Sequence, residues 1–296
     1  MVRYWLRGVL LLLGIALLGA RQLDAGVAIW SPHNISSSAF ESHAAFDPRV
    51  KDLYFVRSSP SFQGWRIIVS HCSKSGWGPA RPATFAGDGV EADPFFTSDG
   101  NSLYFISTRT TDGIKRTDLD IWRVDRDTAR RWGTPVRLPA PINSNANEWF
   151  PRIGADGWLY FGSARHGGLG KTDIWRAKQD VAGDWRVENL GPQINSAADE
   201  FEALPSPDGQ RLIINSADGF YESRLQADGT WGARQRMDAS INVNGTEVGA
   251  LFSPSGHSML FSRDTKGRQS GEFFLANDGT RETWPLDCGR TGRGGG

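Results

Sequence analysis

The sequence predicts an all-β fold built from repeated units of four short strands, and three observations support this. An ordered pattern of residues recurs five times between residues 41 and 288. Short β-branched and aromatic runs are separated by Asp-Gly pairs, which form tight hairpin turns. No segment after the N-terminal region keeps the 3.6-residue apolar period of a helix. The 35 glycines and 15 prolines among 296 residues fit a turn-rich folded chain, and 11% aromatic residues argue for a real core.

The first 25 residues are interpreted as a signal peptide. Arg3 and Arg7 come before an apolar run over residues 8–18. This run is shorter than the roughly 20 residues that span a bilayer. Cleavage could follow Ala20, Ala25 or Ala28, and an uncleaved anchor is the alternative. The mature chain is therefore expected in the periplasm or outside the cell, with no membrane attachment once the signal is removed.

Each repeat begins with a glutamate, followed by an apolar stretch, a turn and a second apolar run. In the third copy, Glu148 is followed by the turn Asp156-Gly157 and by the run Leu159-Tyr160-Phe161. The starting residues of the five copies are Glu41, Glu91, Glu148, Glu200 and Glu247. The copies are 47 to 57 residues apart, which leaves room for several short strands in each.

Every copy continues in the same order with a third strand and a tryptophan, as in Asp173-Ile174-Trp175 and Trp185. Six residues before each glutamate lies an isoleucine, usually followed by asparagine as in Ile194-Asn195, with Phe85 in its place before Glu91. The recurring tryptophans, which we assign to packing, are Trp77, Trp132, Trp185, Trp231 and Trp284. Four strands in about 50 residues is typical of a β-propeller blade, and closing the ring removes exposed sheet edges. The sequence thus predicts a β-propeller of four-stranded blades.

The single predicted domain spans residues 26–288 and is followed by a disordered tail at 289–296. Five copies predict five blades, with six blades as the alternative. The last blade is completed either by the strand-like residues 27–30 or by residues 283–286. Both arrangements bring the last blade against the first.

Four motifs carry a resemblance to a known family: Ser206-Pro207-Asp208-Gly209, Leu159-Tyr160-Phe161, Asp173-Ile174-Trp175 and Gly191-Pro192-Gln193-Ile194-Asn195-Ser196. They resemble the TolB-like, WD-like β-propeller repeats of exported bacterial proteins, over about residues 35–288. The resemblance implies an exported propeller. TolB itself carries a separate α/β domain before its propeller, and the stretch between the signal and Glu41 is too short for one, so the role of TolB in the envelope is not carried over.

The two cysteines, Cys72 and Cys288, are candidates for a structural disulfide. Export places them in an oxidising compartment, where a pair is more often bridged than free. Cys72 falls in the outer half of the first blade and Cys288 at the closing seam, so a bridge between them would close the ring. Two unrelated cysteines are the alternative.

The repeated glutamates are expected near the mouth of the central channel and have two interpretations. They could form a cation site or paired carboxylates for glycoside chemistry. Alternatively, a residue present in every blade serves the blade itself, by accepting backbone N–H bonds where the inner strand starts. A catalytic residue is usually present once, which favours the structural interpretation.

Ligand-binding residues are expected on the face that holds the loops before each inner strand, because loops between the second and third strands share that face and vary most in length. The candidates are Glu91, Glu148, Trp149, Glu200, Arg109, Arg165, His166 and Lys171. Trp149 has no equivalent in the other copies and either stacks on a ligand or packs. Arg109 with Asp120, and Arg165 with Asp173, are expected to pair within their blades, with an anion site as the alternative.

Several function classes are excluded. The 33 basic and 33 acidic residues balance, which removes the electrostatic footprint of a nucleic-acid binder. The five histidines lack metal-ligand spacing, so no metal or other cofactor is expected. The segment Gly167–Thr172 ends like a phosphate-binding loop but has Arg165 where that motif requires glycine. No G-x-S-x-G motif is present.

Two functions remain. The first is an exported, monomeric propeller that binds an envelope protein, a peptide or a glycan through its loops and has no catalytic residue. The second is a propeller glycoside hydrolase or lyase that uses carboxylates at the channel mouth. A hydrolase would need two single-copy carboxylates roughly 5–9.5 Å apart in one pocket.

Overall fold

The computed structural model describes residues 22–23, 26–128, 131–265 and 271–289. Within these ranges the chain forms 21 strands and no helix, which confirms the all-β prediction. The predicted signal peptide lies outside the described residues except for Gln22 and Leu23, and the predicted tail lies outside them except for Gly289. None of the described segments is a helix with the length and apolar content needed to traverse a bilayer.

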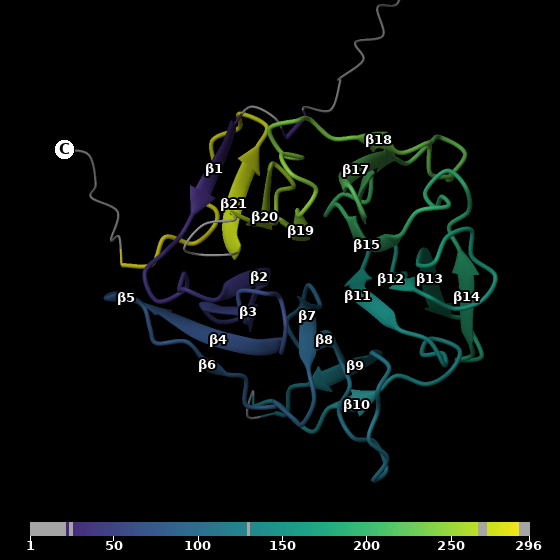
Figure 1. Ribbon diagram of the computed structural model, residues 1–296, viewed down its shortest axis with the longest axis horizontal. Coiled ribbons are helices and arrows are strands. Elements are labelled where there is room, and N and C mark those ends of the chain that lie inside the picture. The colour runs from purple at the N-terminus through teal and green to yellow at the C-terminus, as the bar shows by residue number, and fades with distance from the viewer. Residues whose placement is uncertain (1–21, 24–25, 129–130, 266–270, 290–296) are drawn as a thin grey trace, which may run out of the picture.

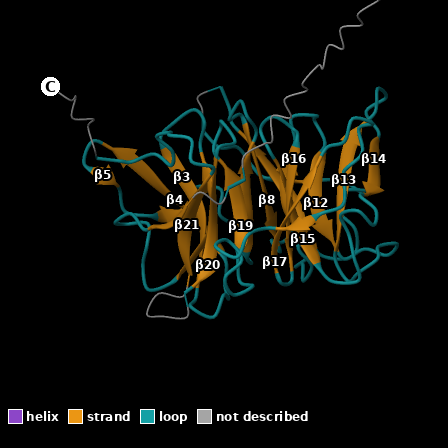
Figure 2. Ribbon diagram, turned by 90° about the horizontal axis from the view of Figure 1, so that it is seen from above, coloured by secondary structure: helices purple, strands orange, loops and turns teal. Residues whose placement is uncertain are grey.

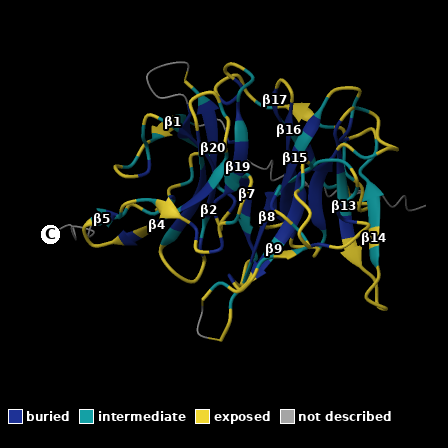
Figure 3. Cartoon of the chain, turned by 60° about the horizontal axis from the view of Figure 1, so that its bottom comes forward, coloured by how far each residue is buried: buried dark blue, intermediate teal, exposed yellow. Residues whose placement is uncertain are grey.

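The sheets are arranged around a common centre, as a propeller (Figure 1). The strands that surround this centre are β2 (Phe40–Phe46), β7 (Glu91–Phe96), β11 (Glu148–Ile153), β15 (Glu200–Pro205) and β19 (Val248–Phe252). We call these the inner strands. Seen from the side, the strands run between two rims of loops (Figure 2). The rim loops carry most of the exposed residues, whereas the inner strands are largely buried (Figure 3).

Three sheets have four antiparallel strands each, in chain order from the inner strand outward. The second repeat forms β7, β8 (Ser102–Ser107), β9 (Asp120–Asp125) and β10 (Val136–Arg137). The third repeat forms β11, β12 (Leu159–Ser163), β13 (Asp173–Gln179) and β14 (Trp185–Asn189). The fourth repeat forms β15, β16 (Arg211–Ser216), β17 (Gly219–Arg224) and β18 (Gln235–Arg236). Each of these three repeats is therefore one four-stranded sheet, as its length predicts.

The fourth sheet has nine strands and contains the first and last repeats. One part holds β19, β20 (Ser258–Asp264) and β21 (Gly271–Asn277), with β1 (Gly26–Trp30) paired antiparallel to β21. The other part holds β2, β3 (Asp52–Ser58) and β4 (Arg66–Ser73), with β5 (Gly76–Trp77) and β6 (Arg81–Pro82) on β4. Of the two predicted ways to complete the last repeat, the structure has the N-terminal strand, and residues 283–286 are not in a strand.

The two parts of this sheet meet at a single parallel pair, Phe40 with Gly271. A Cβ atom at position 271 would overlap the Phe40 ring, so only glycine fits this close approach.

The recurring Ile-Asn pair holds the third strand of its sheet. Ile194 is fully buried, and the Asn195 carboxamide bonds both backbone groups of Ile174 on β13. Its Oδ1 accepts the Ile174 N–H at 2.7 Å, and its Nδ2 donates to the Ile174 carbonyl at 3.0 Å. Asn143 and Asn242 make the same two bonds to Ile121 and Phe220. A buried amide satisfied in this way fixes the loop that leads into the next inner strand.

A disulfide joins Cys72 on β4 to Cys288, with the Cα atoms 5.5 Å apart and the two residues 216 positions apart in the sequence. It ties the C-terminal segment to the first repeat, close to where β1 and β21 end the last repeat. The covalent bond therefore adds a second link between the last and first repeats, beside the pairing of Phe40 with Gly271.

Removing this disulfide should destabilise the fold. On the chain-entropy account, a cross-link over so long a loop lowers the entropy of the unfolded chain and raises the free energy of unfolding by about 3–5 kcal/mol. We expect Cys72→Ser/Cys288→Ser to unfold at a lower urea concentration than the oxidised wild type. Reductant should lower the wild-type midpoint and leave that of the double variant unchanged. Equal midpoints for oxidised and reduced wild type would contradict the prediction.

Candidate functional site

A cavity of about 410 Å³ opens at the channel mouth, on the face of the ring where the inner strands begin. Its walls come from all the repeats, because residues of β2, β7, β11, β15 and β19 and of the loops beside them line it. Six aromatic side chains form one wall: Phe40, Phe62, Trp65, Trp149, Phe150 and Phe201. Asn215, Thr246 and Glu247, from the fourth and fifth repeats, contribute polar groups to the lining.

The aromatic wall is one continuous cluster that crosses between repeats. Trp65, in the loop before β4, lies 6.1 Å from Trp149 on β11, and Trp149 lies 6.4 Å from Phe201 on β15, measured between ring centroids. Phe62 packs on Trp65 at 5.4 Å, and the Trp65 indole N–H donates to the Phe62 carbonyl at 2.9 Å. These four side chains are partly exposed, so their rings are accessible from the cavity.

The floor of the cavity is a buried polar pair, His43 on β2 and Asp93 on β7. His43 Nε2 lies 3.2 Å from Asp93 Oδ1, and the Phe150 N–H donates to Asp93 Oδ2 at 2.8 Å. His43 Nδ1 lies 2.6 Å from the Ser42 hydroxyl. Ser42 is fully buried and does not line the cavity, so this Ser–His–Asp chain does not present a nucleophile to a ligand.

Burial shifts the proton affinities of this pair in opposite directions. Burial raises the pKa of Asp93 to about 7, although the nearby Arg152 guanidinium acts in the other direction. Burial, reinforced by Arg152, lowers the pKa of His43 to about 3. At neutral pH His43 is therefore uncharged, and Asp93 carries a proton for part of the time.

A second buried pair supports this floor. Arg152 on β11 donates to Glu202 Oε1 on β15 through Nη2 at 2.6 Å and Nε at 3.0 Å. The Ala250 N–H donates to Glu202 Oε2 at 3.2 Å. Both side chains are almost fully buried, and burial raises the pKa of Glu202. The pair links the third, fourth and fifth repeats around the channel.

A bulge in every inner strand positions these residues. The pairing of each inner strand with its neighbour slips by one residue just after the repeat glutamate. Bulges turn side chains away from the regular alternation of a strand. The second residues after the glutamates are His43, Asp93, Phe150, Glu202 and Gly249. Four of these five have left-handed backbone angles, with φ between 46° and 68° at His43, Asp93, Phe150 and Gly249.

The repeat glutamates themselves have internal partners. Glu148 is fully buried, accepts the Ser144 N–H at 3.2 Å and the Ser144 hydroxyl at 2.6 Å, and pairs with Arg165 at 3.2 Å. Glu41, Glu91, Glu200 and Glu247 likewise accept the backbone N–H four residues earlier and pair with an arginine. These contacts correspond to the structural interpretation, in which each glutamate serves its own repeat, and not to a cation site or paired catalytic carboxylates. Burial raises the pKa of Glu91 and of Glu148, while the arginines oppose that shift.

Glu247 differs from the others because it also lines the cavity. Its Oε1 takes the Val243 N–H, the Asn244 N–H and Arg263 Nε, the last at 3.0 Å. Its Oε2 is buried and has no hydrogen-bond partner among the described residues.

The expected arginine pairs are wrong. Arg109 bonds Glu91 at 2.5 Å rather than Asp120, and Arg165 bonds Glu148 rather than Asp173. Antiparallel pairing of the first two strands brings each arginine beside the glutamate of its own repeat. Asp120 pairs instead with Arg137 at 2.6 Å.

The remaining sequence candidates divide between the cavity and the outside. Trp149 lines the cavity, whereas Glu91, Glu148, Glu200, Arg109 and Arg165 are occupied within the repeats. His166 and Lys171 are exposed in the loop between β12 and β13 and do not line the cavity. In that loop, the N–H groups of Leu169 and Gly170 bond the Asp173 carboxylate at 2.7 and 2.8 Å, so they are not open to a phosphate.

Sequence reasoning missed His43, Asp93, Phe62 and Trp65. The sequence does contain a signal that could have found His43 and Asp93: the second residue after the glutamate is different in every copy of an otherwise regular repeat. Among the described residues, no group of three or more His, Cys, Asp or Glu side chains has the arrangement of a metal site.

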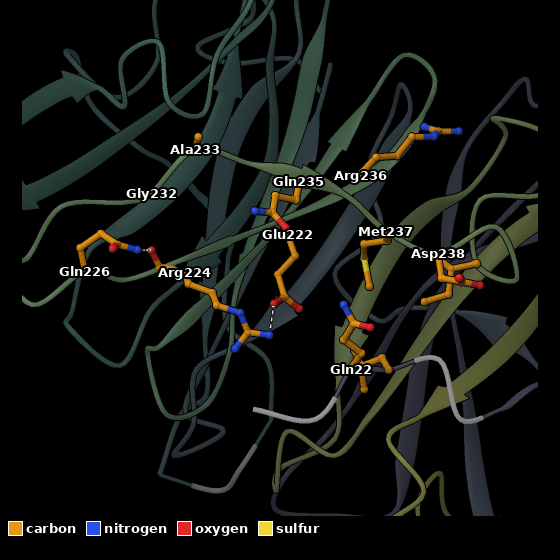
Figure 4. A pocket seen from close by; sticks show the side chains of 12 residues that line it. Gln22, Glu222, Arg224, Gln226, Gly232, Ala233, Gln235, Arg236, Met237 and Asp238 are labelled. Carbon is orange, nitrogen blue, oxygen red and sulfur yellow. Dashed lines mark hydrogen bonds and ion pairs between the residues drawn. The ribbon is translucent and has the colours of Figure 1, made fainter. Parts of the chain in front are cut away.

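A second cavity, of about 390 Å³, lies along β17 and β18 beside Gln22 (Figure 4). Glu222 and Arg224 cross it and pair at 2.5 Å, and the Gln226 amide donates to the Arg224 carbonyl at 3.0 Å. The charges of Glu222 and Arg224 in this cavity therefore neutralise each other.

No protein-family model and no curated protein matches the chain. Among solved structures, the chain is similar to a family 117 glycoside hydrolase from Zobellia galactanivorans, with 8% identity and a TM-score of 0.52 over 89% of this chain and 94% of that one. It is also similar to a gluconolactonase from Xanthomonas campestris, with 13% identity and a TM-score of 0.50 over 88% and 92%. At such identities the likeness is one of fold.

Two TolB structures are also among the solved structures that the chain matches. A putative TolB from Agrobacterium tumefaciens is 16% identical, with a TM-score of 0.48 over 76% of this chain and 70% of that one. TolB from Acinetobacter baumannii is 19% identical, with a TM-score of 0.41 over 86% of this chain. The chain spans 55% of the length of the Acinetobacter protein.

The buried floor predicts opposite pH responses for two variants. Because the folded-state pKa of Asp93 lies above its ordinary 3.8, its protonation stabilises the fold below about pH 4, and this contribution is lost as pH rises through about 7. Relative to the wild type, Asp93→Asn should therefore lose stability as pH falls from 7 to 4, by up to about 1.4 kcal/mol per pH unit.

His43→Gln is the matched opposite. The folded-state pKa of His43 lies below its ordinary 6.5, so the wild type loses stability as pH falls from about 6.5 through about 3. Relative to the wild type, this variant should gain stability over that range. Urea midpoints measured from pH 4 to pH 8 provide the test, and parallel profiles for all three proteins would refute this assignment of protons.

Proposed function

We propose that the protein is an exported five-bladed propeller that binds a peptide, a protein segment or a glycan in the cavity at its channel mouth. The observation that carries this proposal is the cluster of partly exposed aromatic side chains around one concave site. Cavities lined mostly by apolar groups with a few placed polar ones are the usual form of ligand sites.

The blade count is inferred from the nine-stranded sheet. It is joined at one residue pair only, and β1 and β6 supply a fourth strand on either side of that join. Each part also contains one inner strand with its own glutamate and bulge, as do the three four-stranded sheets. Counting the sheet as two blades gives every repeat one blade.

Binding is favoured over catalysis by what the side chains are free to do. The repeat glutamates are held by arginines and backbone N–H groups, so they do not supply the open pair of carboxylates that glycoside hydrolysis needs. The rings of Trp65, Trp149 and Phe201 are exposed to the cavity, and ordering them costs little because they already pack on one another. Such rings stack on sugar rings and on apolar or aromatic side chains.

The loops around the mouth extend this surface. Ile114, Leu169 and Val243 are exposed apolar residues in three loops on the same face as the cavity. A partner larger than a single sugar or amino acid would contact them while one of its groups enters the cavity.

An enzyme with Asp93 as proton donor or acceptor is the second candidate. It is favoured by one observation, namely a carboxyl group with a pKa of about 7 in the floor of the cavity, beside a neutral histidine. Strongly shifted groups in a pocket are typical of catalytic sites, although buried pairs also arise for structural reasons.

Ligand capture should depend on Trp149. We expect immobilised wild-type protein to retain a defined component of an envelope extract, identified by mass spectrometry. The amount retained by Trp149→Leu should be at least about tenfold lower. Trp158→Leu is the matched control, because Trp158 lies in the hairpin between β11 and β12 and outside the cavity. Equal retention by both variants would refute the site. Chemical change of the ligand by the wild type but not by Asp93→Asn would establish the enzyme instead.

Signal cleavage is proposed to follow Ala20, on the evidence of Leu23. Leu23 is 2% exposed and packs with Ile213, Phe220 and Ile241, whereas cleavage after Ala25 or Ala28 would remove it. The N-terminal sequence of the exported protein should therefore begin at Arg21. Leu23→Ala should lower the stability by about 2–4 kcal/mol. A mature protein that begins at Gly26 or Ile29 would contradict this.

A further inference from the structure

We propose that the channel-mouth cavity selects an organic cation, an ammonium or guanidinium group with apolar substituents. The inference rests on the proposed binding function and names the chemistry of the ligand. It depends on three features of the cavity: its aromatic rings, the sign of its charges and the state of its hydrogen-bond donors.

The aromatic rings of the cavity wall come from three repeats. Trp65 belongs to the first repeat, Trp149 to the third and Phe201 to the fourth, and their centroids lie 6.1–6.4 Å apart along the wall. Neighbouring rings meet nearly edge to face, with interplanar angles of 69° and 83°, so the wall presents ring faces in more than one direction. Ring faces attract cations within about 6 Å, most strongly in the case of tryptophan and when water is excluded.

The charged groups of the cavity have one sign. Asp93, Glu247 and Asp264 line it, and no lysine or arginine is among the described residues that do so. Arg263 pairs with Oε1 of Glu247 from outside the lining, while Oε2 of Glu247 is buried with no hydrogen-bond partner among the described residues. His43 adds no compensating positive charge at neutral pH, because burial holds its pKa near 3. Anionic ligands are disfavoured by this field and cations are favoured.

The hydrogen-bond donors on the lining are largely committed to the protein. Asn215 Nδ2 donates to the Glu247 carbonyl at 2.7 Å, and the Thr246 hydroxyl donates to Asn244 Oδ1 at 2.6 Å. The Trp65 indole N–H is taken by the Phe62 carbonyl. A sugar presents hydroxyl groups that need both donors and acceptors, whereas an organic cation needs only ring faces and acceptors. The cation therefore fits the wall better than a glycan does.

The test compares cations with neutral molecules of the same shape. Choline and 3,3-dimethyl-1-butanol differ by the charge on one atom, and acetyl-arginine amide and acetyl-citrulline amide differ in the same way. Binding to the full mature protein is measured by calorimetry and by tryptophan fluorescence at neutral pH. We expect at least one cation to bind about tenfold or more tightly than its neutral counterpart. Preference for choline indicates a free quaternary amine, and preference for the arginine derivative indicates a basic peptide.

Variants locate the effect. Trp149→Leu keeps an apolar side chain but removes the ring, so it should remove the preference for the cation, while Trp158→Leu should keep it. Thermal unfolding of each variant checks that the fold is retained, and Phe201→Leu provides a second ring variant if Trp149→Leu does not fold.

Three outcomes overturn the inference. Equal binding of cation and isostere that is lost in Trp149→Leu rejects the cation and retains the binding function. Binding of a neutral oligosaccharide without binding of either cation identifies a glycan site. Absence of binding by every probe rejects the cation, and capture from the envelope extract then decides separately whether the binding function stands.

Discussion

A buried carboxylate that must be paired is the constraint on which the propeller depends. Each inner strand starts at or beside a glutamate with almost no exposure, and an unpaired charge at such a position would cost several kcal/mol. The glutamate is satisfied by the backbone N–H four residues earlier and by an arginine, as Glu148 is by Ser144 and Arg165. Ser144 lies in the loop that connects two sheets, and Arg165 follows the second strand of its own sheet. The same bonds therefore fix the connecting loop, the start of the inner strand and the end of the neighbouring strand.

The cavity exists because the chain leaves regular pairing just after this anchor. The glutamate holds the strand end, and the following bulge turns His43, Asp93 and Phe150 toward the channel with left-handed backbone angles. Those angles are unfavourable for residues other than glycine, and they persist because the bonds on both sides hold them. The buried Arg152–Glu202 pair then ties three repeats together beneath the mouth. The paired glutamates and the Arg152–Glu202 pair thus hold His43 and Asp93 in place, although both of these side chains are buried away from water.

The repeat made much of the fold predictable from the sequence, whereas the site was only partly predictable. Spacing and turn residues predicted four strands per copy, and the strand-like segment 27–30 was recognised as one way to complete the last copy. Trp149 stood out because the other copies lack it. Arg109 is expected to pair with Asp120 because an arginine and an aspartate recur at corresponding places of two copies, but antiparallel pairing places Glu91 beside it. His43 and Asp93 are missed because a search for repeats finds residues that recur, whereas these two stand at a repeat position that holds a different residue in every copy. Their contact at 3.2 Å joins residues 50 positions apart, through a bulge that alternation does not indicate.

The bulge separates the residues that build the ring from those that face the channel. The frame uses the same glutamate in every repeat, while the residue two positions later is histidine, aspartate, phenylalanine, glutamate or glycine. The glutamate before this position stays the same while the residue at it differs from repeat to repeat. Substitution at His43, Asp93 or Phe150 can therefore change what the channel mouth recognises and leave the glutamate in place. Glu202 and Gly249 are constrained further, by the ion pair with Arg152 and by the close approach of the His43 backbone.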